Sequence, residues 1–291
     1  MRLDGRRESS NVEDRRGMSA VKKAGIGGLG AIIVAALFAW MSGGDPMQAV
    51  MQGVQEQMAQ QTETVGEENF TEEEQALASD CKKILASTED VWTKVFQENG
   101  FGEYQNPTLV LFSNQVNSAC GAATAAVGPF YCSGDQKLYI DLSFFTEMKR
   151  QLGVEGNTFA YAYVIAHEIG HHVEYMLGTL NKAHQAMSQT NKTQANQISV
   201  RLELLADYYA GVWAHYEDAM NHSMEYGDLE KGLELAKAIG DDWLQKKAQG
   251  RATPESFTHG TSDQRKRWLK MGYQTGDMRT STFSIQNYSD L

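Results

Sequence analysis

Two histidines lie four residues apart in the run His-Glu-Ile-Gly-His, which extends from His167 to His171. On a helix this spacing places both imidazoles on one face, with Cβ atoms roughly 5–6 Å apart, so both could bind one metal ion. Glu168 lies between them and could reach a metal-bound water without being a ligand. His172 points about 100° away on a helix and is not expected to share the metal. The pattern predicts a catalytic metal site, and the alternative is a pair of core histidines.

A zinc enzyme needs a third protein ligand, and two carboxylates further along the chain are candidates. Glu203 and Asp207 are four residues apart in a segment that is otherwise rich in leucine, alanine and tyrosine. Carboxylates on an apolar helix are costly to bury unless they are paired or bind a metal. We expect Glu203 to be the third ligand and Asp207 to accept the far N–H of a ligating histidine. The alternatives are a solvent-exposed acidic face and, as third ligand, His184 in a polar connector.

A later segment, His-Gly-Thr-Ser-Asp-Gln-Arg, begins at His259 and ends at Arg265. The oxyanion formed during peptide hydrolysis needs an electrophile besides the metal, and His259 could supply it as a catalytic residue. An ordinary loop histidine before a helix is the alternative. Tyr208 or Tyr209 could serve in its place.

These residues must be positioned by helices and a small sheet. Thr71 and Glu74 form a capping box that opens a helix, which Asn99 and Gly100 end. Two β-rich runs follow, and the rest of the chain has helical periodicity. A few strands followed by many helices indicate an α+β domain that is mainly helical with a small sheet. The expected strands are 108–113 and 137–145, and the expected helices are 157–177, 194–220, 228–249 and 261–273.

An uncharged segment at residues 24–42 is long enough to cross a bilayer as a helix. Lys22 and Lys23 precede it and place the N-terminus in the cytoplasm by the positive-inside rule. A cleaved signal peptide is the alternative, although no clear cleavage site follows. We therefore expect one transmembrane helix with the catalytic domain outside the cytoplasm, which in a bacterium means a single-pass inner-membrane protein with a periplasmic catalytic domain. The expected parts are a basic cytoplasmic tail (1–23), the anchor (24–42), a stalk (43–70) and a metallopeptidase domain (71–291).

The charge distribution separates the two ends of the chain. Residues 1–23 hold seven basic and four acidic groups, which leaves 19 basic and 33 acidic groups for the remainder. So acidic a body argues against nucleic acid as a partner. Small residues at positions 27, 31, 35 and 39 could pair two anchors in the membrane as a homodimer, and a generic small-residue anchor is the alternative.

Cys120 and Cys132 flank a short loop that contains glycine and proline. Outside the cytoplasm these two cysteines could oxidise to a disulfide, leaving Cys81 over. Closing so short a loop would stabilise the fold by roughly 2–3 kcal/mol. Three buried free thiols are the alternative.

Several of these motifs occur together in one known family. The run from Gly5 to Arg16, the segment from Cys120 to Cys132, the HEIGHHVE run and the segment beginning at His259 together resemble the bacterial neutral zinc metallopeptidases of the YpfJ-like family. HExxH followed by ExxAD on a second helix is similar to the gluzincins. The resemblance covers nearly the whole chain except the expected stalk. It implies a membrane-anchored, zinc-dependent peptidase with a zincin-like fold.

The late segment also resembles an element of related membrane peptidases of the HtpX type. In those proteins an arginine braces the site near the acidic helix, which implies that Arg265 pairs with Asp207.

These residues together predict hydrolysis of peptide bonds in a peptide or protein substrate. Zn²⁺ bound by His167, His171 and Glu203 would activate a water, and Glu168 would act as the general base. The substrate would lie along an edge strand formed by residues 122–131 or 137–141. The alternative function is a non-catalytic, membrane-anchored scaffold or adaptor with a structural zinc site.

Overall fold

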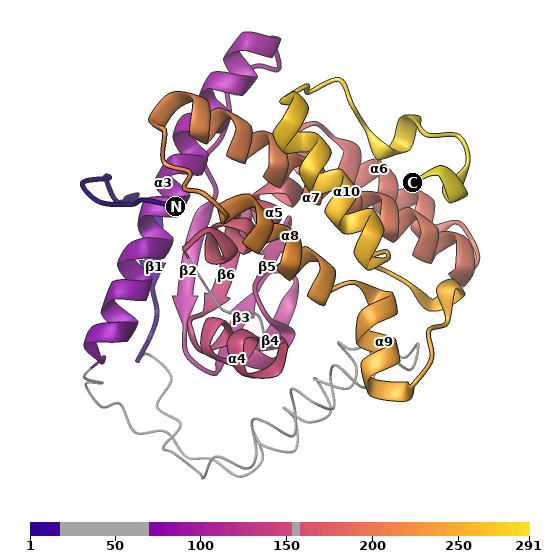
Figure 1. Cartoon of the computed structure of the whole chain (residues 1–291), viewed down its shortest axis with the longest axis horizontal. Coiled ribbons are helices and arrows are strands. Elements are labelled where there is room, and N and C mark those ends of the chain that lie inside the picture. Colours follow the sequence, from indigo (N-terminus) through magenta and orange to yellow (C-terminus); the bar gives the residue numbers. More distant parts are fainter. Residues whose placement is uncertain (18–69, 153–157) are drawn as a thin grey trace.

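The computed structural model describes residues 1–17, 70–152 and 158–291 (Figure 1). It is mostly helical with two small sheets, in agreement with that part of the predicted fold. The first sheet has the order β1-β2-β6-β5, in which β1 and β6 run parallel to β2 and β5 runs antiparallel to β6. The second is a hairpin of β3 and β4. The strands are β1 (Val12–Asp14), β2 (Thr108–Phe112), β3 (Gln115–Ser118), β4 (Gly121–Thr124), β5 (Phe130–Cys132) and β6 (Lys137–Asp141).

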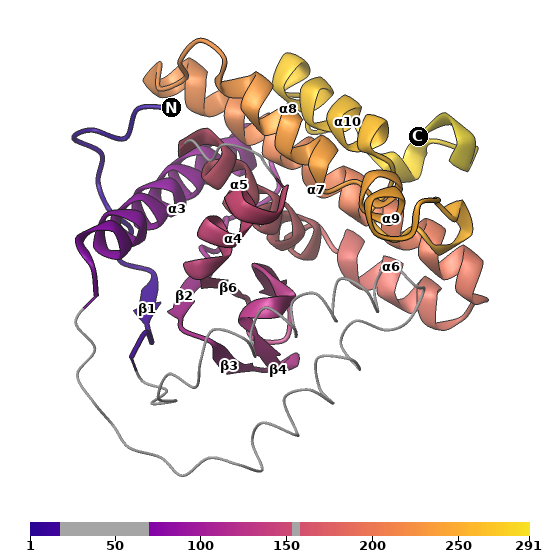
Figure 2. The same cartoon turned by 60° about the horizontal axis from the view of Figure 1, so that its bottom comes forward.

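Helix α5 lies at the centre of the helical part of the fold. Helix α5 contacts α3, β5 and α7, and α7 in turn packs along α10 (Figures 1 and 2). The helices are α3 (Glu72–Asn99), α4 (Ser143–Leu152), α5 (Thr158–Met176), α6 (Thr179–Ser188), α7 (Lys192–Asn221), α8 (Asp228–Ala238), α9 (Asp241–Gln249) and α10 (Ser262–Thr275).

Glycines allow α7 to approach both of its helical neighbours closely. A Cβ on Gly170 of α5 would lie 2.8 Å from the carbonyl oxygen of Ala206. A Cβ on Gly272 of α10 would lie 2.0 Å from the carbonyl oxygen of Tyr208. Neither position has room for a larger residue, so α5, α7 and α10 pack backbone to backbone next to the predicted metal residues.

Local sequence signals located some elements well and others poorly. The capping box of Thr71 and Glu74 opens α3, and Gly100 ends that helix with a φ of 70°, as predicted. The run expected as one strand up to residue 145 leaves the sheet after Asp141 and continues as α4. The single helix expected over residues 228–249 is two helices, because the chain turns at Gly240. A Cβ there would lie 2.4 Å from the backbone nitrogen of Ser262.

The structure does not support the predicted membrane anchor or the single-pass inner-membrane location. No helix within the described ranges is both long and apolar enough to span a bilayer. Residues 24–42, the stripe of small residues within them and nearly all of the expected stalk lie outside the described residues. One membrane crossing between residues 17 and 70 would also put β1 and β2 on opposite sides of a bilayer. Instead, the two strands pair in one sheet.

Residues 1–17 are part of the fold rather than a separate tail. Arg6 donates from both Nη atoms to Glu217 of α7, and Arg7 donates to Glu89 of α3. The two carboxylates are only 0% and 4% exposed. Buried charges need partners, so these two arginines hold the N-terminal segment against α3 and α7.

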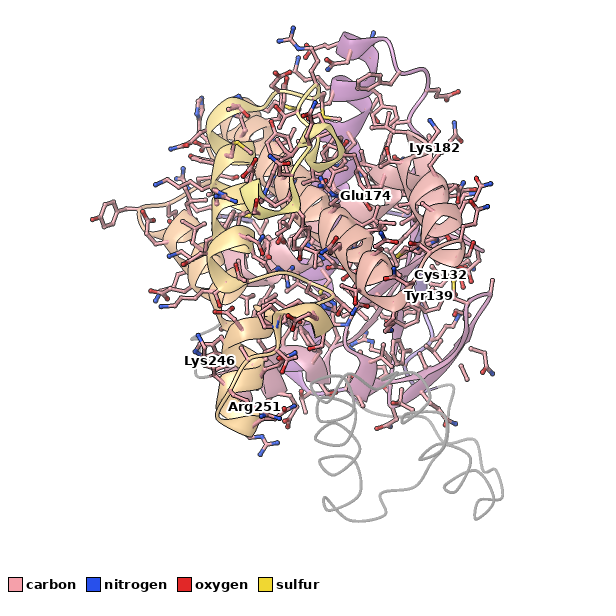
Figure 3. The ribbon with its side chains drawn as sticks, turned by 90° about the vertical axis from the view of Figure 1, so that its right-hand side faces the viewer. Cys132, Tyr139, Glu174, Lys182, Lys246 and Arg251 are labelled. Carbon is pink, nitrogen blue, oxygen red and sulfur yellow. A yellow bond between two sulfur atoms is a disulfide. The ribbon has the colours of Figure 1, made fainter. Side chains whose placement is uncertain are left out.

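The predicted disulfide between Cys120 and Cys132 is present, with the Cα atoms 5.8 Å apart. It connects the β3–β4 turn to β5, which lies at the edge of the main sheet. Cys132 and Tyr139, which are labelled in Figure 3, belong to a small apolar cluster that also includes residues of the β3–β4 hairpin. Cys81 is a buried free thiol in α3.

Candidate metal centre

His167, His171 and Glu203 converge where α5 meets α7. The Nε2 atom of His167 lies 3.2 Å from Glu203 Oε2, and the Nε2 atom of His171 lies 3.6 Å from Glu203 Oε1. One ligand atom from each residue can be chosen so that all three lie within 4.8 Å of one another. Two turns of separate helices thus place two imidazoles and a carboxylate around one point, which is the arrangement expected from the sequence.

The other ring nitrogen of each imidazole is held by a buried carboxylate. His167 Nδ1 lies 2.8 Å from Asp207 Oδ1, and His171 Nδ1 lies 2.9 Å from Glu174 Oε2. These contacts turn both Nε2 atoms toward Glu203. Two imidazole nitrogens and one carboxylate are ligands that suit zinc, so the residues present fit a zinc ion.

Asp207 lies at the centre of a buried ionic network. Arg265 donates from Nε to Asp207 Oδ2 at 2.8 Å and from Nη2 to Oδ1 at 3.0 Å. The hydroxyl of Tyr163 donates to the same Oδ1 at 2.6 Å. Burial raises the pKa of Asp207, but Arg265 and His167 outweigh it and lower the pKa to about 2. Asp207 therefore stays ionised. Arg265 thus contacts Asp207, the partner that the resemblance to the HtpX-type peptidases implied.

Glu174, which is labelled in Figure 3, was not among the residues predicted from the sequence, and it is fully buried beside His171. Burial raises its pKa to about 7, even though the neighbouring His171 lowers it. A signal for this residue was present in the sequence. Glu174 follows His171 by three residues on an apolar helix, so the two side chains share a face.

Glu168 lies next to both the metal cluster and β5. Burial raises its pKa, while the charges of His167 and His171 lower it. The backbone N–H of Tyr131, in β5, also lowers this pKa as a hydrogen-bond donor to the carboxylate. The predicted base thus lies between the histidines and the edge strand.

His172 lies outside the cluster, as its helical position indicated. Its Nε2 donates to the carbonyl of Gln105 at 2.7 Å, so its Nδ1 accepts from the hydroxyl of Tyr131 at 2.8 Å. Burial lowers its pKa to about 4 and keeps the ring neutral. His172 therefore connects β5 to α5 without approaching the metal ligands.

The remaining candidates differ in their distance from the site. His259 Nε2 lies 4.0 Å from Glu203 Oε1, beside the cluster. Burial raises the pKa of Glu203, but His259 and the two ligand histidines hold that pKa well below its usual value. His184 is on α6 and does not belong to the cluster. The Tyr208 hydroxyl bonds to Thr275 and Asp277, and the buried Tyr209 ring packs edge-on against Trp92.

The amino-acid sequence matches a known protein family. The family described as "Putative neutral zinc metallopeptidase" matches residues 1–283. The YpfJ protein of Escherichia coli K12 is 43% identical over 286 residues, which cover 95% of this chain and 96% of YpfJ. The chain belongs to the neutral zinc metallopeptidase family.

Other relatives cover less of the chain. The proteins Mb2605 of Mycobacterium bovis and Rv2575 of Mycobacterium tuberculosis are each 43% identical over 183 residues, or 60% of this chain and 61% of the relative. No solved structure matches the chain. Membership in a zinc metallopeptidase family implies zinc, and the His-His-Glu cluster is a group that could hold it.

Proposed function

We propose that this protein hydrolyses peptide bonds with a zinc ion bound by His167, His171 and Glu203. The observation that carries the proposal is the convergence of two Nε2 atoms on one carboxylate. Both opposite Nδ1 atoms are held by buried carboxylates, so the imidazoles are aimed before any metal arrives. This support favours a tightly held ion with room for one more ligand.

The chemistry at this site divides between the metal and the side chains. Bound zinc supplies a Lewis acid that polarises the scissile carbonyl and lowers the pKa of a coordinated water toward ~7. Glu168 accepts the proton of the attacking water on its carboxylate and then delivers it to the leaving amine. Burial raises the pKa of Glu168, which makes this carboxylate a stronger base toward the attacking water.

The opposite side of the reacting carbonyl would face His259. As the carbonyl becomes tetrahedral, negative charge builds up on its oxygen, and a donor in a partly dry site stabilises that charge. His259 Nε2 lies beside Glu203, and its side chain is 31% exposed, so it borders both the cluster and solvent. It therefore serves as the donor in the proposed reaction.

The peptide substrate would add to the sheet alongside β5. Of the two runs expected from the sequence, 137–141 is the interior strand β6, whereas 122–131 ends within β5 at the sheet edge. Within the described ranges β5 is hydrogen-bonded to β6 on one side only. A peptide paired with the other side would run past Glu168, because the Tyr131 amide and that carboxylate already adjoin.

Glu168→Gln tests the proposal. The substitution keeps the shape of the side chain but removes the base, so cleavage of an unfolded protein such as casein should fall roughly 10²–10⁴-fold. The zinc content, measured by inductively coupled plasma mass spectrometry, should stay at that of the wild type. Equal cleavage by both proteins would refute Glu168 as the base. Zinc retained with no cleavage by either protein would favour the scaffold instead.

A further inference from the structure

One carboxylate outside the metal cluster organises the loop that carries His259. Asp241, the first residue of α9, is 4% exposed. Its Oδ2 atom accepts three successive backbone N–H groups, from Thr258 at 2.8 Å, His259 at 2.7 Å and Gly260 at 2.9 Å. The Asp241 N–H in turn donates to the Gly260 carbonyl at 2.9 Å. The loop is therefore wrapped around this one side chain.

Helix α7 holds the same loop from the opposite direction. Ser199 donates to the carbonyl of Thr258 at 2.9 Å, and Asn196 donates to the carbonyl of Glu255 at 2.9 Å. Gly260 has a φ of +92° and lies against α7, where a Cβ would come within 3.3 Å of Leu204 Cδ2. Leu204 directly follows the ligand Glu203. The loop thus rests on the turn of α7 that carries the third metal residue.

These two attachments leave the imidazole of His259 between two carboxylates. Its Nδ1 lies 3.7 Å from Asp241 Oδ1, and its Nε2 lies 4.0 Å from Glu203 Oε1. The hydroxyl of Thr258 lies 2.9 Å from the same Nδ1. Asp241 therefore uses one oxygen to fix the backbone of the loop and presents the other to the ring.

We propose that Asp241 is a positioning residue for the reaction, which holds the His259 imidazole with Nε2 directed toward the substrate carbonyl. The proposal rests on the proposed peptidase function, in which His259 touches the substrate and Asp241 acts only through it. The fixed loop backbone and the Asp241 carboxylate on the Nδ1 side hold the ring in one orientation, which keeps Nε2 where the oxyanion forms.

The neighbouring residue provides a matched control. Asp242 also holds this part of the chain, because its Oδ1 accepts from the backbone N–H of Ser262 at 2.7 Å and from the Ser262 hydroxyl at 2.8 Å. These two contacts are with Ser262 rather than with His259. Asp242→Asn therefore reports the effect of weakening the attachment of the loop without changing the charge that faces the ring.

The experiment measures kcat and KM on one peptide substrate with the zinc-loaded full chain. The variants are Asp241→Asn, His259→Ala, the double variant and Asp242→Asn. We expect His259→Ala to lower kcat about 10²-fold, the loss typical of an oxyanion donor. Asp241→Asn should lower kcat about tenfold, a loss at the lower end of that for a residue that orients another, with KM and zinc content unchanged. Asp242→Asn should stay within about twofold of the wild type.

The double variant decides between positioning and a general structural role. If Asp241 acts through His259, the double variant should be no slower than His259→Ala, because residues that act as a unit are not additive. A further tenfold loss in the double variant, or an equal loss in Asp242→Asn, would overturn the proposal. If circular dichroism shows that Asp241→Asn does not fold, Asp241→Glu replaces it, and the same lowered kcat at unchanged KM is expected.

Different results would refute the proposed peptidase function and the proposed role of Asp241. If wild type does not cleave, or if Glu168→Gln cleaves as well as wild type, the proposed function fails. If Glu168→Gln abolishes cleavage while His259→Ala and Asp241→Asn leave kcat unchanged, the peptidase function stands and the role of Asp241 is refuted.

Discussion

Each of the two metal-facing imidazoles contacts a buried carboxylate, but the two carboxylates differ in the partners that hold them. His167 meets Asp207 at 2.8 Å and His171 meets Glu174 at 2.9 Å, and both carboxylates are fully buried. Asp207 is also bonded by Arg265 and by the hydroxyl of Tyr163. By contrast, Glu174 Oε1 has no hydrogen-bond partner among the described residues.

The difference shows what a cation from a third helix adds to a histidine–carboxylate pair. Arg265, from α10, outweighs the effect of burial and lowers the pKa of Asp207 to about 2. Without such a partner, burial raises the pKa of Glu174 to about 7. His167 is therefore held by a permanent charge, whereas the carboxylate beside His171 exchanges its proton near neutral pH. The His167 side of the site is the more rigidly preorganised side.

Removing the carboxylate that both imidazoles contact should have the largest effect on zinc binding and activity. Glu203 contacts both imidazoles, so Glu203→Ala leaves two neighbouring histidines that bind metal weakly. We expect the purified variant to lose its zinc and its peptidase activity, as measured by metal analysis and casein cleavage. Glu234→Ala, which changes an exposed glutamate of α8, is the control. Stoichiometric zinc in Glu203→Ala would show that another ligand completes the site.

Removing the Arg265 cation should lower the unfolding free energy of the protein. Arg265→Met leaves the Asp207 charge buried and without its main partner, which costs about 3–5 kcal/mol of unfolding free energy. Urea unfolding of the zinc-free protein measures this, with the exposed Arg267→Met as control. Asp207→Asn in the same chain should restore much of the loss. A cost below about 1 kcal/mol would mean that Arg265 contributes little to this network.

The smallest expected effect is a difference in zinc affinity between variants of Asp207 and Glu174. Asp207→Asn should weaken zinc binding about 100-fold and Glu174→Gln about tenfold, which are the two ends of the range for residues that orient metal ligands. The weaker effect is expected for Glu174 because this carboxylate is already partly protonated near neutral pH. Competition with a chromophoric chelator gives both dissociation constants. Equal losses would contradict the idea that Arg265 makes the two sides unequal.

The metal-facing residues were predictable because their signals are local. His167 and His171 share a helical face through their spacing, and the carboxylates of Glu203 and Asp207 stand out in an apolar helix. The pairing of Arg265 with Asp207 followed from the resemblance of the late segment to the HtpX-type peptidases rather than from spacing. The roles of all these residues stay predictions until the variants are measured.

The parts that the sequence did not reveal depend on contacts between distant segments. Asp241 was hidden inside an expected continuous helix, because the turn at Gly240 exists only through its close approach to Ser262. Arg6 and Arg7 were interpreted as part of a basic tail, since nothing near them in sequence indicates buried carboxylates. The uncharged run at residues 24–42 carried the prediction of an anchor, and length and apolarity alone do not fix where a segment lies.

The attachment of the N-terminal segment also determines when the fold can be completed during synthesis. Arg6 and its partner Glu217 are separated by 211 residues. At about 5–20 residues per second, the ribosome needs roughly 10–40 s to make the chain between them. Until then Arg6 lacks this acceptor. Closure of this ion pair is therefore a late step of biosynthesis, and nascent chains that stop before α7 cannot reach the native arrangement of their first residues.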